Sequence, residues 1–241
     1  MKIEPFRGER LSEPLASVRH KSRLLVLLHA LERVGVAPVR MKRLHAFAYL
    51  ADVLSPVWGL VPYDGVIYKM EAGPHYSDLQ RELDDLVLMG LVDILDLRYI
   101  DAGADGAWID GLYQLNFESN TLHSILDLLG VGNAADALDP RDVERNAHLV
   151  ELAHALSTLD SEELDEAAKV DATYSSKAYQ DGTVIDFREA KTTLDDGAQD
   201  VNKSVAVTEK FVDFFPNSTN LSSSERIYLY ANYLGRRMQA V

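Results

Sequence analysis

The chain has 241 residues, of which 47% are hydrophobic, and this is enough to bury a substantial core. It contains no cysteine, which excludes disulfides and thiolate metal sites and is typical of a cytoplasmic protein. There is no run of about 18 apolar residues, so no membrane span is expected. The start of the chain also lacks the apolar stretch of a secretory signal.

The net charge of −14 is unevenly distributed. Residues 1–50 hold ten Lys/Arg and four Glu, a net charge of +6, whereas the other 191 residues hold fourteen Lys/Arg and thirty-four acids, a net charge of −20. Such asymmetry predicts one basic surface on an otherwise acidic body. An acidic body repels nucleic acid. We therefore expect the protein to contact DNA mainly through a partner, and directly only through that basic surface.

The first part of the chain predicts two helices and a strand. Residues 1–17, which contain two prolines and a glycine, predict an irregular lead-in. Leucines at helical spacing predict a helix from residue 18 to a stop at Gly35, and a second helix is expected within 36–55. Aromatic and β-branched residues alternate within 57–71, which predicts one or two short strands.

The next segment predicts a helix followed by a β-hairpin. Ser77 is the expected N-cap of a helix over 78–89, which Gly90 ends. Hydrophobic alternation on both sides of a turn at 102–106 predicts the two strands of the hairpin. Residues 18–117 therefore have the order helix, helix, strand, helix, hairpin. This order is typical of a winged helix-turn-helix domain with a β-hairpin wing.

Residues 118–241 predict a mostly helical C-terminal region. Helices are expected at 119–132, from Pro140 after an Asp139 cap, and from a capping box formed by Asp160 and Glu163. A last helix follows the polar stretch that ends at residue 226. The predicted fold class is therefore mainly α (α+β), a winged helix followed by a helical C-terminal extension.

The sequence contains no pattern that indicates catalysis or metal binding. His148 and His154 are six residues apart, which places them about 120° apart around a helix. The zinc-protease pattern instead needs two histidines four residues apart with a glutamate between them. The chain also lacks a glycine-rich loop ending in Lys and a Gly-x-Ser-x-Gly turn. We therefore expect no catalytic residue, no metal and no cofactor, and a protein that is not an enzyme.

The charge of the helix over 78–89 argues against a DNA-reading role. A recognition helix needs Lys, Arg, Asn or Gln toward the groove, but this helix combines several acids with one Arg81. A carboxylate close to a phosphate repels it. We instead expect this face to bind a protein partner, with the acids Asp78, Glu82 and Asp85 as contact residues.

A basic cluster in the first two helices is the remaining candidate for contact with DNA. Cations near helix N-termini can hold backbone phosphates without reading the base sequence. The alternative is that these cations pair with acids of the same chain or of a partner. The candidates for phosphate contact are Arg19, Lys21, Arg23, Arg40, Lys42 and Arg43.

The last helix concentrates residue types that are enriched in protein interfaces. Tyrosine and arginine are over-represented among the residues that contribute most to binding energy. The alternative is that the tyrosines complete the core of the helical half. The candidate partner-binding residues on this helix are Tyr228, Tyr230, Tyr233, Arg236 and Arg237.

The segments "RLLVLLHALERVG", "RMKRLHAFAYLADVL" and "YKMEAGPHYSDLQRELDDLVLMGLVDI" resemble the winged-helix proteins of the Panacea and YwgA type. The resemblance covers residues 20–117 and rests mainly on the turn at 73–74, on Tyr76 and Ser77, and on the helix exit at 90–92. The C-terminal "LSSSERIYLYANYL" is loosely similar. Within this group the chain looks closest to the small middle component of bacterial ABC three-component systems, which include Lamassu.

The resemblance implies a role in a protein complex. In such systems a structural-maintenance-of-chromosomes-like (SMC-like) ATPase works with an effector such as a nuclease and with a small winged-helix subunit. The leading hypothesis is therefore a non-catalytic accessory subunit that bridges ATPase and effector in a bacterial antiphage (antiviral) defence complex, a hetero-oligomer. The rival hypothesis is a DNA-binding regulator or antitoxin that uses the basic N-terminal cluster.

Overall fold

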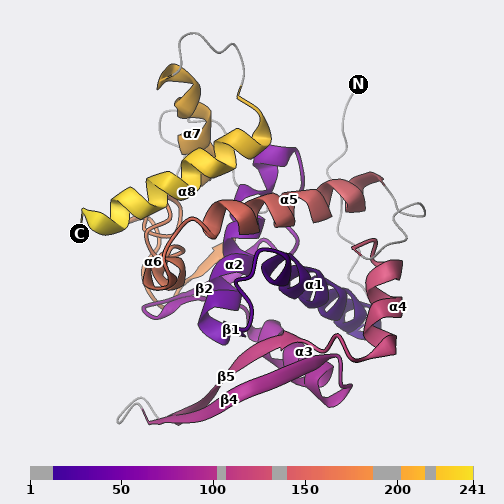
Figure 1. Cartoon of the computed structure of the whole chain (residues 1–241). Helices are drawn as coiled ribbons and strands as arrows, with labels where there is room; N and C mark the ends of the chain where they lie inside the picture. The colour runs from indigo at the N-terminus through magenta and orange to yellow at the C-terminus, as the bar shows by residue number, and fades with distance from the viewer. Residues whose placement is uncertain (1–12, 102–106, 132–139, 187–201, 215–220, 241) are drawn as a thin grey trace.

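A computed structural model of the chain describes residues 13–101, 107–131, 140–186, 202–214 and 221–240. In this part the fold is α+β, a body of packed helices with two small antiparallel sheets along its lower side in the view of Figure 1. Within these ranges no helix combines the length and the hydropathy that a bilayer span requires.

Helices alternate with strands in the N-terminal half and predominate in the C-terminal half. Short 3-10 helices, η1 (Ser55–Trp58) and η4 (Phe211–Phe214), follow the second and seventh α-helices. The α-helices of the described ranges are α1 (Glu13–Arg33), α2 (Met41–Leu54), α3 (Ser77–Leu88), α4 (Asn120–Leu128), α5 (Pro140–Leu156), α6 (Ser161–Glu166), α7 (Lys203–Lys210) and α8 (Ser223–Gln239).

The strands form two three-stranded antiparallel sheets. The first has the order β1-β5-β4, so the short strand before α2 pairs with the second strand of the β4–β5 hairpin. The second has the order β3-β2-β6; β2 and β3 lie in the connection between α2 and α3, and β6 comes from the C-terminal region. Their bounds are β1 (Val39–Arg40), β2 (Val66–Met70), β3 (Gly73–His75), β4 (Val92–Asp101), β5 (Ala107–Leu115) and β6 (Val184–Asp186).

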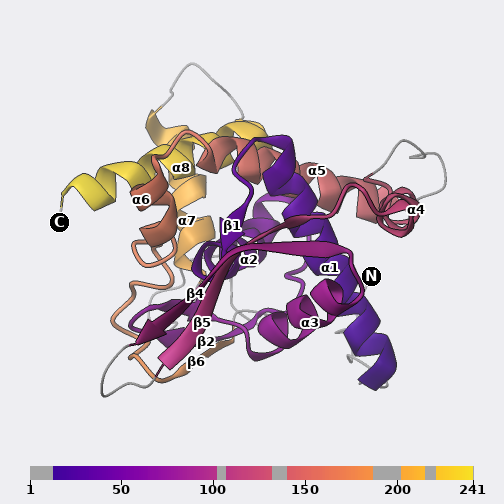
Figure 2. The same cartoon turned by 60° about the horizontal axis from the view of Figure 1, so that its bottom comes forward.

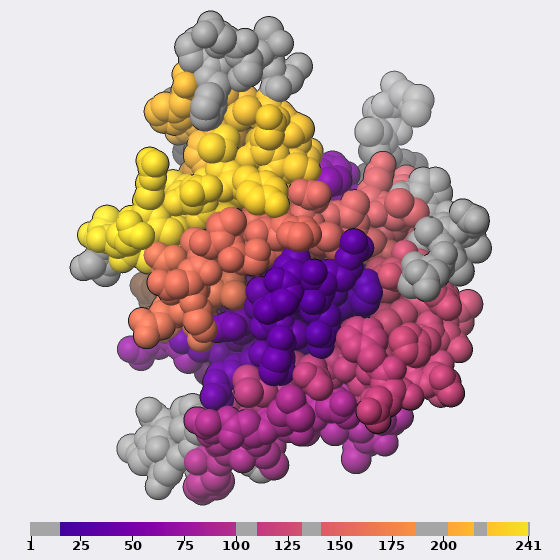
Figure 3. All heavy atoms as spheres, viewed as in Figure 1, coloured from indigo at the N-terminus to yellow at the C-terminus, as the bar shows by residue number. Residues whose placement is uncertain are grey.

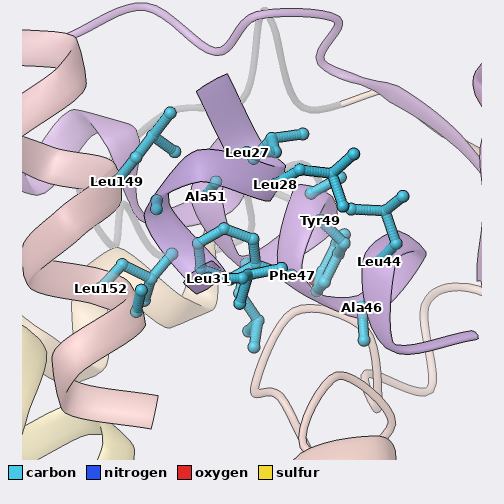
Figure 4. Close-up of a cluster of buried hydrophobic side chains, with 14 of the residues drawn as sticks. Leu27, Leu28, Leu31, Leu44, Ala46, Phe47, Tyr49, Ala51, Leu149 and Leu152 are labelled. Carbon is cyan, nitrogen blue, oxygen red and sulfur yellow. The ribbon is translucent and has the colours of Figure 1, made fainter. Parts of the chain in front are cut away.

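Helix α2 lies at the centre of the hydrophobic core. Every residue from Leu44 to Leu54 is buried, and a helix that is buried all round needs packing partners on every side. α1 and α5 supply two of these partners, with Leu27, Leu28 and Leu31 from α1 and Leu149 and Leu152 from α5 (Figure 4). Each such large side chain contributes roughly 1.5–3 kcal/mol when it is fully buried.

The β4–β5 hairpin extends away from the helical body (Figure 2). Near the body its register pairs Ile94 with Tyr113, and farther out it pairs Tyr99 with Ile109. Between Leu95 and Arg98 the register shifts by one residue, which is a β-bulge. Opposite this bulge only glycine fits at position 111, because a Cβ atom there would lie only 2.8 Å from the Ile94 side chain.

The C-terminal region shares its core with the N-terminal part. Strand β6 pairs with β2, so that Val184 lies opposite Tyr68 across a gap of more than a hundred residues in the sequence. Helix α5 packs against α1 and α2, and α8 packs against α5 (Figure 1). Residues 18–117 and 118–241 therefore do not have separate cores within the described part of the chain.

Most of the predicted elements are present, with shifted ends. α1 begins at Glu13, so the lead-in predicted for 1–17 is wrong for its last five residues, and residues 1–12 lie outside the described ranges. The predicted N-cap Ser77 is instead the first residue of α3, after Tyr76. The capping box of Asp160 and Glu163 is confirmed, whereas the Asp139 cap also lies outside the described residues.

A buried carboxyl group joins α2 to the C-terminal helices. Asp171 is fully buried and accepts hydrogen bonds from the hydroxyls of Tyr49 on α2 (2.5 Å), Tyr230 on α8 (2.6 Å) and Ser204 on α7 (2.6 Å). It also accepts two backbone N–H groups at 2.9 Å. Burial, and then the nearby Asp171, raise the pKa of Tyr49 and Tyr230 well above the ordinary value, so both hydroxyls stay protonated and donate.

We predict that Asp171→Ala destabilises the protein by at least about 3 kcal/mol, because several buried donors lose their acceptor at once. Denaturant unfolding at neutral pH measures this loss. The exposed Asp213 of η4 provides the control, and Asp213→Ala should change the unfolding free energy by less than about 0.5 kcal/mol. Equal losses in the two variants would show that the network does not hold α2, α7 and α8 together.

Candidate interaction surface

Glu82 of α3 is not available to a partner. Its side chain is only 1% exposed, and it accepts hydrogen bonds from Ser17 of α1 at 2.7 Å, from Lys21 and from Arg81 at 3.0 Å. Burial opposes its ionisation, but these hydrogen bonds, the one from Lys21 foremost, hold the pKa of Glu82 below the ordinary value. The prediction that Glu82 is a partner contact is therefore wrong, because this carboxylate ties α3 to α1.

The other predicted acids of α3 remain at the surface. Asp78 and Asp85 are about half exposed, and each has a cationic neighbour, Arg81 at 3.1 Å and Lys21 at 2.8 Å respectively. Asp84 is exposed as well and accepts a hydrogen bond from Gln80. The exposed face of α3 therefore carries three carboxylates and one guanidinium group, as expected for a surface that does not bind phosphates.

The cations of α1 are held by groups of the same chain. Lys21 binds Glu82 and Asp85, as described above. Arg23 is buried and binds two carboxylates, Asp52 at 2.7 Å and Asp64. Arg19 donates to the carbonyl of Tyr63 at 3.2 Å, and its guanidinium group lies over the Tyr63 ring, 4.4 Å from the centroid.

The cations around the start of α2 also have internal partners. Arg40 pairs with Asp110 of the hairpin. Lys42 pairs with Glu166 at 2.5 Å, and Arg43 donates to Asp165 at 2.7 Å. Five of the six candidates for phosphate contact are thus paired with acids of this chain. This agrees with the alternative that these cations pair with acids of the same chain. Their acidic partners lie on α2, α3, β5, α6 and the segment after η1, so these cations do not form one basic surface.

Helix α8 contributes mostly to the core. Tyr230 is fully buried, so its predicted partner contact is wrong, and Tyr228 and Tyr233 are partly buried against the core. Arg237 lies over the Tyr233 ring, 5.6 Å from its centroid, and donates to Ser175. Of the five predicted contact residues on α8, only Arg236 is exposed.

Strand β4 of the hairpin exposes several apolar side chains. Tyr99 is 74% exposed, Leu97 is 60% exposed and Leu95 is 40% exposed. Tyr99 lies opposite Ile109, and residues 109, 111 and 113 of β5 share one face because successive side chains of a strand alternate. Leu97 lies over the same face at Gly111.

This face of the hairpin continues the surface that α3 covers. Tyr113 on the same face has Gln80 and Asp84 of α3 as neighbours, and burial raises its pKa above the ordinary value. Farther out on the hairpin than Tyr113, Leu97 and Tyr99 of β4 lie in solvent. In the space-filling view the magenta hairpin lies along the margin of the molecule, below α1 (Figure 3). The sequence holds one signal for these exposed apolar residues. The alternating strands are long enough to extend past the core.

A buried ion-pair group holds the N-terminal part of α1 in place. Arg23 binds Asp52 of α2, which also accepts the Tyr63 N–H at 2.9 Å and the Tyr76 hydroxyl at 3.0 Å. Asp64 binds His20 at 3.4 Å as well as Arg23. The hydrogen bond that His20 donates to the Asp64 carboxylate raises the pKa of His20, against the opposing effect of burial.

We predict that Lys21→Ala destabilises the protein by about 2 kcal/mol, because it leaves the buried Glu82 carboxylate without its main cation. The matched control is Lys42→Ala. Lys42 and Glu166 are each more than 40% exposed, and loss of such a pair costs less than about 1 kcal/mol. Urea unfolding at neutral pH compares the two. Equal losses would mean that Glu82 does not depend on Lys21.

We also predict a pH-dependent effect of His20→Gln. Because the pKa of His20 is raised in the folded state, its stabilisation is fully present below the unfolded pKa of about 6.5 and is lost as pH rises through the folded pKa. The stability difference between wild type and His20→Gln should therefore shrink from pH 6 to pH 9. In an Asp64→Asn background the difference should no longer shrink as pH rises, because burial then acts on His20 without its carboxylate partner; an unchanged slope there would contradict the assignment.

The surface left for a partner consists of exposed acids on α3 and exposed apolar residues on the hairpin. Among the described residues, no group of His, Asp or Glu side chains is arranged to hold a metal ion. The six cations do not assemble into a site. No protein-family model, no characterised protein and no solved structure matches this chain.

Proposed function

We propose that the chain is a non-catalytic protein-binding subunit whose docking surface is formed by α3 and the β4–β5 hairpin. In line with the resemblance of residues 20–117, we further propose that it bridges an SMC-like ATPase and its effector, such as a nuclease, in a bacterial antiphage complex. DNA would then be engaged mainly by the partner.

The order of the elements supports a winged-helix interpretation of the N-terminal part. Helix α1, strand β1 and helices α2 and α3 precede the hairpin, and β1 joins the hairpin in the order β1-β5-β4. In this arrangement α3 occupies the position of the recognition helix and β4–β5 that of the wing. The connection between α2 and α3 also contains β2 and β3, an addition to the simple pattern.

The observation that carries the proposal is the exposed apolar part of the hairpin beside acidic α3. An apolar side chain gains free energy when a protein surface covers it, roughly 25 cal/mol for each Å² removed from water. Contiguous exposed apolar residues are typical of protein-binding sites. Asp84 of α3 lies near Tyr113 of the hairpin, and the same helix exposes Asp78 and Asp85; these carboxylates favour a basic partner surface and repel a polyanion.

The rival function, a DNA-binding regulator, requires free cations on one face. Five of the six candidate cations already bind carboxylates of the same chain. To bind phosphates they would have to give up these ion pairs, some of which are buried. Salt-sensitive duplex binding that is lost when Arg40, Lys42 and Arg43 are changed to Glu would support the rival and contradict our proposal.

We predict that the wild-type chain co-purifies with the products of the adjacent genes after co-expression, and that Leu97→Ala combined with Tyr99→Ala greatly reduces the co-purified amount. Truncation of exposed apolar residues that become buried in an interface typically costs more than about 1 kcal/mol each. Quantitative pull-down from co-expressing cells measures the effect.

The matched control is Phe214→Ala on η4, because Phe214 and Tyr99 have the same exposed fraction of 74%. Phe214→Ala should leave the complex intact. A wild-type chain that stays alone at every salt concentration would contradict the proposed function. Equal retention of the hairpin variant and the control would contradict the assignment of the surface.

A further inference from the structure

A cavity of about 330 Å³ lies between the N-terminal half of α1, the segment after η1, and the helices α4 and α5. Its wall has an apolar part and a part rich in arginine. Its size is at the lower end of the range for small-molecule sites, which is about 300–1,000 Å³. We propose that this cavity binds a small organic anion, an apolar body with one carboxylate or phosphate group. The inference is independent of the proposed docking function.

Three guanidinium groups converge on the ring of Tyr63 at the wall of this cavity. The Cζ atoms of Arg19, Arg23 and Arg145 lie 4.4, 4.8 and 5.8 Å from the ring centroid. Two of these arginines come from α1 and the third comes from α5, more than 120 residues later. All three positive charges thus lie within 6 Å of the same ring centroid, so an anion that binds beside this ring is favoured electrostatically.

The three arginines differ in how far their charge is already neutralised. Arg23 binds Asp52 and Asp64 and donates to the Ala48 carbonyl, so few of its N–H groups remain to bind a ligand. Arg145 has one exposed carboxylate neighbour, Asp142 at 3.2 Å. Arg19 has no carboxylate partner among the residues that the structure describes, and its hydrogen bond goes to a carbonyl oxygen. Arg19 and Arg145 are therefore the expected contacts of the anionic group.

The Tyr63 ring that carries these cations is itself fixed. Its backbone N–H donates to Asp52 at 2.9 Å, and its hydroxyl donates to the Arg19 carbonyl. Burial raises the pKa of Tyr63 to about 12, so its hydroxyl is neutral at physiological pH. The Tyr63 side chain therefore adds no negative charge to the site, and these hydrogen bonds hold it in position without a ligand.

The remaining wall suits an apolar body. It is built mainly from aliphatic side chains of α1, α4, α5 and the segment after η1, and burial of such a body releases water from them. His148 also lines the cavity; burial lowers its pKa to about 4, so it is neutral and adds no charge. Its Nε2 donates to the Ala51 carbonyl at 3.0 Å. The aliphatic lining residues are Val26, Leu27, Leu60, Leu128, Leu129 and Leu149.

The test titrates the full chain with octanoate, octyl phosphate, octanol and inorganic phosphate by calorimetry. At least one of the two octyl anions should bind, and octanol and inorganic phosphate should bind at least about tenfold more weakly. Comparison of octanoate with octyl phosphate then distinguishes a carboxylate ligand from a phosphate ligand. Octanol binding as tightly as the anions, or no binding of either anion at millimolar concentration, would overturn the proposal.

Arg19→Gln and Arg145→Gln should each weaken binding of the octyl anion about tenfold. The matched control is Arg33→Gln, which removes the same charge from the exposed C-terminal end of α1, away from the cavity, and should leave the affinity unchanged. Circular dichroism verifies that each variant is folded. If all three variants bind equally, or if Arg33→Gln weakens binding as much as Arg19→Gln, the cavity is not the anion site.

Discussion

The fold depends on the need to give every buried polar group of α2 a partner. This helix is buried on all sides, yet it contains Tyr49 and Asp52, which cannot be placed in an apolar core unpaired. Asp52 is satisfied by Arg23 of α1, and Tyr49 is satisfied by Asp171 of the C-terminal region. Two polar contacts on the same helix thereby fix α1 on one side and the C-terminal helices on the other.

The same requirement explains the distribution of surface charge. Basic residues of the first fifty positions pair with acids of the same chain, on α2, α3, β5, α6 and the segment after η1. The exposed side chains of α3 and the hairpin are therefore mainly acidic and apolar. The arginines and lysines near the start of the chain alone would have suggested a basic surface. Internal ion pairing thus leaves an acidic and apolar surface on α3 and the hairpin, despite the local excess of positive charge near the start of the chain.

Local patterns in the sequence predict much of the fold. Leucine spacing predicts the helices around 18–35 and 78–89, and alternation predicts the hairpin, because these patterns reflect burial of one face. The pairing of β6 with β2 and the burial of Glu82 depend on contacts between distant parts of the chain. Charge alone does not reveal such contacts, since Lys42 and Glu166 are separated by 124 positions. For the same reason the arginine cluster around Tyr63 leaves no local motif.

The bulge between Leu95 and Arg98 has a consequence for solubility. Strand β4 is an edge strand, because it pairs only with β5 within the described sheet. A long flat apolar edge is a template for aggregation through strand addition. Here the extra residue, Asp96 with a φ of 48°, interrupts the edge and places an ion pair with Arg98 beside the exposed leucines. The hairpin can thereby expose apolar side chains while its edge strand resists pairing with the edge strand of another copy.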